Sequence, residues 1–208
     1  MTSADAASGG SPHVVWHDTA VSREQRWRRH GLHGLTVWLT GLSGSGKSSI
    51  ANAVAERLLD EGIVGYLLDG DNIRHGLNGD LGFAADDRAE NVRRLGEVAR
   101  LMSDAGLVVL VPAISPYASD RERVRAAHAD AGLAFVEVFV DIPLEMCEER
   151  DPKGLYREAR AGRLRGFTGI DDPYQAPATP ELRIGPASLA EQADAVMALI
   201  SRVVATAN

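Results

Sequence analysis

The chain has a single cysteine, Cys147, among its 208 residues, so no disulfide can form within it. Its apolar runs are short, and none approaches the roughly eighteen residues that a membrane-spanning helix needs. Basic residues are in the minority, because 22 Lys and Arg stand against 29 Asp and Glu and leave a formal net charge of -7. These deficits predict a cytoplasmic protein that neither crosses a membrane nor binds nucleic acid, since a reducing compartment keeps thiols free and nucleic-acid partners usually carry a basic excess.

The first residues also lack a secretory signal, because Met1 to Pro12 are rich in Ala, Ser and Gly without a basic region or an apolar block. We expect residues 1–30 to be a partly disordered N-terminal extension. One domain should follow at residues 31–208, because a chain of this length supports one sizeable core. His13 and His17 lie four residues apart, but without a helical pattern or a third ligand they predict no zinc site.

Apolar runs of strand length alternate with longer stretches of helical periodicity, which is typical of βαβ units. The expected strands are Leu35 to Thr40, Ile63 to Leu68, Leu107 to Val111, Phe135 to Val140 and Leu182 to Ile184. The clearest helices are Ser48 to Asp60, Asp86 to Ala105 and Ser188 to Ala205. We therefore predict a single α/β domain with a parallel sheet flanked by helices, and functional groups at the C-terminal ends of the strands.

The segment after the first strand matches the phosphate-binding pattern GxxxxGK[ST]. Its residues are Gly41, Leu42, Ser43, Gly44, Ser45, Gly46, Lys47 and Ser48, with Ser49 next in the following helix. The glycines allow backbone N–H groups to surround a phosphate chain, Lys47 would reach the β- and γ-phosphates, and the Ser48 hydroxyl would ligate Mg²⁺. A glycine-rich turn with an incidental lysine is the alternative, but the flanking strand and helix favour the phosphate site, which predicts nucleoside triphosphate binding by a domain of the P-loop NTPase type.

The second strand leads into Asp69, Asp71 and Arg74, beside the expected phosphate site. Phosphoryl transfer requires an oriented hydroxyl group, cations around the phosphate oxygens, and a carboxylate that accepts the proton or organises Mg²⁺. We assign the catalytic roles to Asp71 as that carboxylate and to Lys47 on the transferred phosphate. Asp69 has two equally good interpretations, a functional carboxylate or the cap of a short helix.

Residues 162–180 are rich in Gly, Pro and Thr and show no periodicity. Loops of this length in a compact domain are usually functional or mobile. We predict a mobile lid at about residues 153–174, called the lid segment below, which would exclude water from the reaction.

Further motifs resemble those of the adenylylsulfate kinase family, in its order and spacing, over nearly everything from Trp16 onward. They are Asp69-Gly70-Asp71-Asn72-Ile73-Arg74, Gly76-Leu77-Asn78, Asp80-Leu81-Gly82-Phe83, Arg88-Ala89-Glu90-Asn91, Ile114-Ser115-Pro116-Tyr117, Cys147 to Tyr156 and Gly166 to Tyr174. The resemblance implies Mg²⁺-dependent transfer of the γ-phosphoryl group of ATP to the 3′-hydroxyl of adenosine 5′-phosphosulfate (APS), giving 3′-phosphoadenosine 5′-phosphosulfate and ADP in sulfate activation. It also implies a homodimer and leaves open an association with a sulfate adenylyltransferase.

The same resemblance implies which residues hold the two substrates. For APS they are Asp71, Arg74, Phe83, Arg88, Asn91, Ile114, Ser115, Lys153, Leu155 and Phe167, with the two phenylalanines on either side of the adenine. Arg150 and Pro177 would join the phosphate loop in binding ATP, and Mg²⁺ is expected at Ser48 and Asp71. Ser115 matches a serine proposed in some relatives as a transient phosphoryl carrier, a possible phosphoserine. We interpret it as a binding residue, because direct in-line transfer needs only ATP, Mg²⁺ and acceptor held together.

Other interpretations stay open at this point. Phe83 and Phe167 taken alone are typical of core residues, although their glycine-rich surroundings favour a site. Arg93 and Arg94 are adjacent on a helix, so at most one can face the site, and neither is assigned to it. A small-molecule kinase with another acceptor and a nucleotide sensor without turnover are the rival functions, and the intact Lys47, Ser48 and Asp71 argue against the sensor.

Overall fold

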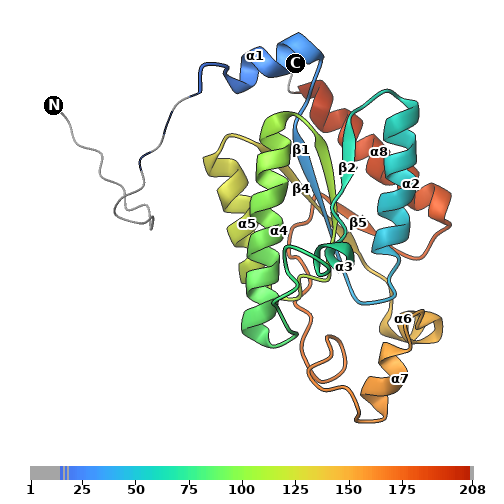
Figure 1. Cartoon of the computed structure of the whole chain (residues 1–208). Helices are drawn as coiled ribbons and strands as arrows, with labels where there is room; N and C mark the ends of the chain where they lie inside the picture. Colours follow the sequence, from blue (N-terminus) through green and yellow to red (C-terminus); the bar gives the residue numbers. More distant parts are fainter. Residues whose placement is uncertain (1–14, 16, 18, 207–208) are drawn as a thin grey trace.

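The structure, a computed structural model, describes residues 15, 17 and 19–206. These residues form a five-stranded parallel sheet in the order β2-β3-β1-β4-β5, with helices on both faces (Figure 1). The predicted α/β class with a parallel sheet is confirmed. Predictions that fall on residues 1–14, 16 and 18, including any role of His13, lie outside the described residues.

The strands occur close to where the sequence predicts them. Their bounds are Leu35–Thr40 for β1, Gly65–Leu67 for β2, Val108–Pro112 for β3, Ala134–Val140 for β4 and Leu182–Ile184 for β5. β1 and β5 have the predicted bounds, and β2 is shorter because Val64 and Tyr66 lie at the exposed edge of the sheet.

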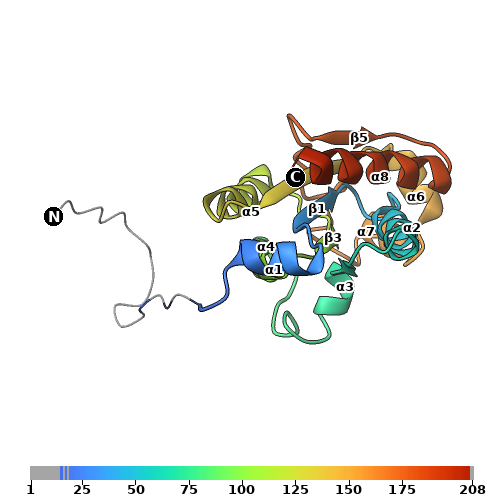
Figure 2. The same cartoon turned by 90° about the horizontal axis from the view of Figure 1, so that it is seen from above.

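The central strand β1 is buried on both faces, which explains its continuous apolar run. Leu35, Val37 and Leu39 face a cluster formed with α2 (Lys47–Asp60) and α8 (Leu189–Thr206). Trp38 faces the opposite cluster, formed with α4 (Ala85–Ala105) and α5 (Ala118–Asp130). Seen from above, α2 and α8 lie on one side of the sheet and α4 and α5 on the other (Figure 2).

A short helix that the sequence analysis does not predict, α1 (Arg23–His30), packs against α4. Its side chains reach Asp104: Arg23 pairs with the carboxylate, and the indole N–H of Trp27 donates to the backbone oxygen at 2.9 Å. No residue of α1 is buried, so its sequence lacks the periodic apolar residues that predict a helix. The sequence does contain one indication of this helix, the capping box, in which Ser22 and Gln25 exchange hydrogen bonds at the helix start.

The remaining short helices lie at the edge of the sheet formed by the C-terminal ends of the strands (Figure 1). They are α3 (Gly70–Ile73), α6 (Leu144–Arg150) and α7 (Leu155–Arg160). After α7, residues 161–181 contain no helix or strand, as predicted, apart from an isolated bridge between Thr168 and Asp172. None of the helices in the described part of the chain has the length and apolar composition needed to cross a bilayer.

Candidate active site

The phosphate loop, residues 41–48, joins the end of β1 to the start of α2. Two of its glycines are required by geometry. A Cβ atom on Gly41 would lie 2.6 Å from the backbone oxygen of Val140, and Gly46, the N-cap of α2, has a φ of +100°. Because α2 begins inside the loop, the positive end of its dipole points toward any group that the loop encloses.

Lys47 folds back over the loop, and only 8% of it is exposed. Its ammonium group donates hydrogen bonds to the backbone oxygens of Gly41 at 3.0 Å and Leu42 at 2.7 Å. Burial is the main reason that the pKa of Lys47 falls from 10.5 to about 8. A desolvated cation at this place can interact strongly with a phosphate, since nearby water does not weaken the attraction.

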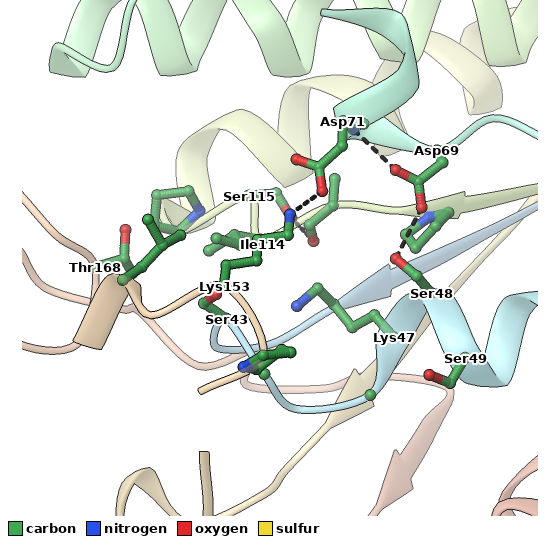
Figure 3. Close-up of a pocket in the computed structure, with 18 of the residues that line it drawn as sticks. Ser43, Lys47, Ser48, Ser49, Asp69, Asp71, Ile114, Ser115, Lys153 and Thr168 are labelled. Carbon is green, nitrogen blue, oxygen red and sulfur yellow. Dashed lines mark hydrogen bonds and ion pairs between the residues drawn. The ribbon is translucent and has the colours of Figure 1, made fainter. Parts of the chain in front are cut away.

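The two carboxylates after β2 have different partners. Asp69 accepts a hydrogen bond from the Ser48 hydroxyl at 2.8 Å with one oxygen, and the backbone N–H of Asp71 donates to the other at 2.8 Å (Figure 3). Asp69 is therefore the cap of α3 and a neighbour of the phosphate loop, while its interpretation as a functional carboxylate remains a prediction. The carboxylate of Asp71 instead forms an ion pair with Lys153.

The oxygen-rich groups around Ser48 fit Mg²⁺. This ion prefers oxygen ligands and usually takes only one or two from the protein, with phosphates and water supplying the rest. The Ser48 hydroxyl and the Asp69 carboxylate already lie within hydrogen-bond distance of each other, and Asp71 follows two residues later. The part of the chain that the structure describes has no group of three or more His, Cys, Asp or Glu side chains that could hold a metal.

A cavity of about 1150 Å³ lies over the C-terminal ends of the strands. It runs from the phosphate loop to the residues of α4 and the lid segment. It brings together most of the residues predicted from the sequence. Those that line it are Ser43, Gly44, Gly46, Lys47, Ser48, Ser49, Asp71, Arg74, Phe83, Arg88, Asn91, Ile114, Ser115, Arg150, Lys153, Leu155 and Phe167.

Four predicted residues do not line this cavity. Gly41, Leu42 and Ser45 belong to the phosphate loop, but their oxygens hold the ammonium group of Lys47 instead of lining the cavity. Pro177 is buried after the lid segment and away from the cavity wall, so the geometry does not support its predicted role in binding ATP.

The two phenylalanines in the cavity wall differ in exposure. Phe83 is 68% exposed, and the guanidinium of Arg74 lies over its ring at 4.4 Å from the centroid. Phe167 is only 8% exposed and packs edge-on against Tyr156, with ring centroids 5.0 Å apart. Phe83 is thus an exposed aromatic ring with Arg74 over it, whereas Phe167 belongs both to the core and to the cavity wall. Such surfaces suit a flat ring such as a nucleobase.

Arg88 of α4 holds the lid segment. Its guanidinium donates to the hydroxyl of Thr168, to the carboxylate of Asp172 and to the backbone oxygen of Gly166. The pair with Asp172 is largely shielded from solvent, with 13% and 22% of the side chains exposed. Tyr117 adds a hydrogen bond from its hydroxyl to the same carboxylate at 3.2 Å. The predicted substrate arginine therefore also ties the lid segment to the body of the protein.

The structure adds wall residues that the sequence analysis did not assign. Thr168 follows Phe167 in the lid segment, while Asn52, Leu189 and Gln192 extend the wall beyond Ser49. The position of Asn52 could have been found, because it lies four residues after Ser48 and therefore on the same face of α2. Leu189 and Gln192 come from α8, and only the packing of α8 on α2 brings them to the cavity.

The parallel sheet, the phosphate loop after its central strand and the carboxylates at the next strand end define a P-loop phosphotransferase. Residues 33–185 match the sequence profile of the adenylylsulphate kinase family. The chain belongs to this family. The resemblance seen in its motifs is confirmed.

Curated relatives agree with the family assignment. The chain is 54% identical over 183 residues to a probable adenylyl-sulfate kinase of Halalkalibacterium halodurans, covering 88% of this chain and 90% of that protein. It is 58% identical over 191 residues to the bifunctional enzyme CysN/CysC of Mycobacterium tuberculosis, covering 91% of this chain. The chain spans only 30% of the length of that bifunctional relative.

A solved structure is also similar over the whole kinase domain. The APS kinase CysC of Mycobacterium tuberculosis, in complex with AMPPNP and APS, is 60% identical and superposes with a TM-score of 0.80. The match covers 82% of this chain and 99% of that one.

Proposed function

We propose that this chain transfers the γ-phosphoryl group of ATP to the 3′-hydroxyl of APS. The proposal rests on one observation: the same cavity is lined by the phosphate loop at one end and by Asp71, Arg88 and two phenylalanines at the other. In the reaction, the 3′-oxygen forms a bond to the γ-phosphorus, the bond from that phosphorus to the bridging oxygen of ADP breaks, and the hydroxyl proton leaves. The products are ADP and 3′-phosphoadenosine 5′-phosphosulfate.

The phosphate loop supplies the donor side of the reaction. Its backbone and the first turn of α2 bind the phosphate chain, and Lys47 leaves the backbone oxygens of Gly41 and Leu42 to bind the β- and γ-phosphates. Arg150 extends along the loop, 3.4 Å from the oxygens of Gly44 and Ser45, where its planar group can stack on the ATP base. Mg²⁺, held by Ser48 with Asp69 or Asp71, would neutralise charge on the transferred phosphate.

Asp71 acts at the other end of the cavity. We assign it as the group that orients the 3′-hydroxyl and receives its proton, because it is a carboxylate in the cavity wall two residues after the Mg²⁺ neighbour Asp69. Lys153, paired with Asp71 in the structure, can bind the anionic tail of APS.

The acceptor wall fits the rest of APS. Phe83 and Phe167 offer aromatic surfaces for its adenine, and Arg74 and Arg88 offer guanidinium groups for its phosphosulfate. Arg88 also closes the lid segment over the cavity through Asp172, which would exclude water from the phosphoryl group.

The assembly and the setting form part of the proposal. We propose a homodimer in the cytoplasm. We also propose that it works with a sulfate adenylyltransferase, because such an enzyme makes the acceptor and the bifunctional relative carries a further part on the same chain. Size-exclusion chromatography with light scattering tests the dimer directly.

The activity is tested by incubating the protein with Mg·ATP and APS and identifying the product by mass spectrometry and ³¹P NMR. We expect one new phosphate on the 3′-oxygen of the ribose and one ADP for each product molecule. A phosphate at another position, or ADP without a phosphorylated acceptor, would disprove the assignment.

A further inference from the structure

A buried cluster of hydroxyl groups lies behind the acceptor wall. Thr40 Oγ1 is 2.9 Å from the hydroxyl of Tyr174, 3.1 Å from that of Ser115 and 2.7 Å from the backbone oxygen of Ile114. The indole nitrogen of Trp38 lies 3.0 Å from Ser115 Oγ. Trp38, Thr40 and Ser115 are at most 3% exposed.

The chemistry of these groups fixes the direction of each hydrogen bond. A backbone oxygen only accepts, so the single proton of the Thr40 hydroxyl goes to Ile114, and Thr40 can then only accept from Tyr174 and Ser115. The Ser115 hydroxyl has the backbone oxygen of Ala113, at 3.3 Å, as a second acceptor. The indole N–H of Trp38 can only donate, so Ser115 accepts it. Burial raises the pKa of Tyr174 to about 12, so its phenol keeps the proton that it donates.

Thr40 is the point where three parts of the site meet. It is the last residue of β1 and precedes Gly41, whose oxygen holds Lys47. Ile114 and Ser115 line the cavity on the acceptor side, and Tyr174 ends the lid segment. Thr40 itself is not among the residues that line the cavity, so it can act only through its neighbours.

The acceptor wall is held in an unusual backbone conformation at this point. Ser115 has a φ of +42°, a left-handed conformation that costs energy for a residue with a side chain. The buried guanidinium of Arg121 supports it by donating to the oxygen of Ser115 at 2.7 Å and to the oxygen of Gln175 at 2.7 Å. A wall that needs such support will move when one of its hydrogen bonds is lost.

We propose that Thr40 is a positioning residue for phosphoryl transfer: its hydroxyl fixes the acceptor wall and the end of the lid segment against the phosphate loop. Ser115 takes part as a link in this network through its hydroxyl and not as a phosphoryl carrier. The inference rests on the proposed function, because the distance that Thr40 fixes is the one between the γ-phosphate and the acceptor hydroxyl.

The variant Thr40→Val tests this role, because it keeps the shape of the side chain and removes the hydroxyl. We expect the KM for APS to rise roughly tenfold or more and kcat to fall, while the KM for ATP stays within about twofold of the wild type. Thr40→Ser, which keeps the hydroxyl, should restore the KM for APS. Tyr174→Phe removes one donor only and should raise the same KM less.

Thr36→Val is the matched control. Thr36 lies in the same strand and is fully buried, and its hydroxyl makes one buried hydrogen bond, 2.9 Å to His128, where that of Thr40 makes three; it does not line the cavity. Its variant should be less stable without a change in either KM. A Thr40→Val protein that behaves like Thr36→Val would overturn the proposal, because loss of folded protein alone lowers kcat and leaves both KM values unchanged.

Hydrogen exchange measured by mass spectrometry separates this proposal from the proposed function. In Thr40→Val, the backbone at residues 113–117 and 166–175 should exchange faster than in the wild type, and in Thr36→Val it should not. If the wild type shows no APS-dependent turnover but the exchange changes as stated, the proposed function fails and the structural role of Thr40 stands. If the wild type turns over APS but Thr40→Val leaves the exchange at these residues unchanged, the role of Thr40 is rejected instead.

Discussion

The ammonium group of Lys153 forms an ion pair with the carboxylate of Asp71, which joins the first residue of the lid segment to the short helix α3 (Figure 3). The pair lies in the wall of the cavity, where the proposed transfer takes place. Both side chains are more than half exposed, so the pair contributes little to folding, and we predict that its role lies in binding.

Lys153→Met should therefore impair binding of APS much more than stability. We expect the KM for APS to rise roughly tenfold, because a charge-assisted contact to the anionic acceptor is lost, with an unfolding free energy within about 0.5 kcal/mol of the wild type. Steady-state kinetics and urea unfolding measure the two effects. Arg160→Met, which removes the ion pair of a similarly exposed cation with Glu148, is the control and should change neither. An unchanged KM in Lys153→Met would exclude a contact with the acceptor.

Arg88→Met should release the lid segment. It removes the contacts with Thr168, Gly166 and Asp172, so limited proteolysis should cut within residues 166–172 faster than in the wild type. We also expect a higher KM for APS and more ATP hydrolysis without acceptor, because water gains access to the phosphoryl group.

The control for Arg88 is Arg93→Met on the same helix. Arg93 pairs with Glu90 at the surface and does not line the large cavity. Equal proteolysis rates for the two variants would show that Arg88 does not anchor the lid segment.

Affinity for ATP should fall as pH rises above 8. The pKa of Lys47 is lowered from 10.5 to about 8 by burial, so the unliganded folded protein loses this proton at a pH where the unfolded chain still keeps it.

Between pH 8 and 10.5 the unfolded state binds more protons, and the stability difference between the wild type and Lys47→Met should shift in favour of the wild type as pH rises. Calorimetric titration with ATP and thermal unfolding across this range measure both effects. A pH-independent stability difference would show that Lys47 titrates normally.

The buried pair of Arg121 and Glu137 should matter for stability. The two side chains are 3% and 5% exposed and 2.6 Å apart, and Arg121 also holds the oxygen of Ser115. Arg121→Met leaves Glu137 in the interior with less compensation, which should cost about 3 kcal/mol of unfolding free energy. Arg183→Met, which breaks an exposed pair with Asp141 at 3.5 Å, should cost less than about 1 kcal/mol in the same urea titration. Equal losses would contradict this account.

The sequence predicted those parts of the site that depend on neighbouring residues. The phosphate loop follows from glycine spacing after an apolar strand, and the position of Asp71 follows from its place at the end of β2. Parallel strands end at the same edge of a sheet, so the two had to meet. The roles of these residues in binding and catalysis remain predictions.

Contacts between distant segments could not be read in the same way. The hydrogen bond from Ser48 to Asp69, the hold of Arg88 on the lid segment and the Thr40 network join residues 21 to 134 positions apart. Each depends on how helices and loops pack in three dimensions. The helix α1 was missed for a related reason, because it is held by Asp104 of α4 and not by an apolar face of its own.

The most direct test of the central claim is the steady-state release of ADP from Mg·ATP with APS, with no acceptor and with an acceptor that lacks the 3′-hydroxyl, for the wild type and Asp71→Ala. The account predicts rapid ADP release only when APS carries its 3′-hydroxyl, and a loss of this turnover of roughly a hundredfold or more in Asp71→Ala. ADP release from the wild type that is the same with all three mixtures would contradict the claim that this chain phosphorylates APS.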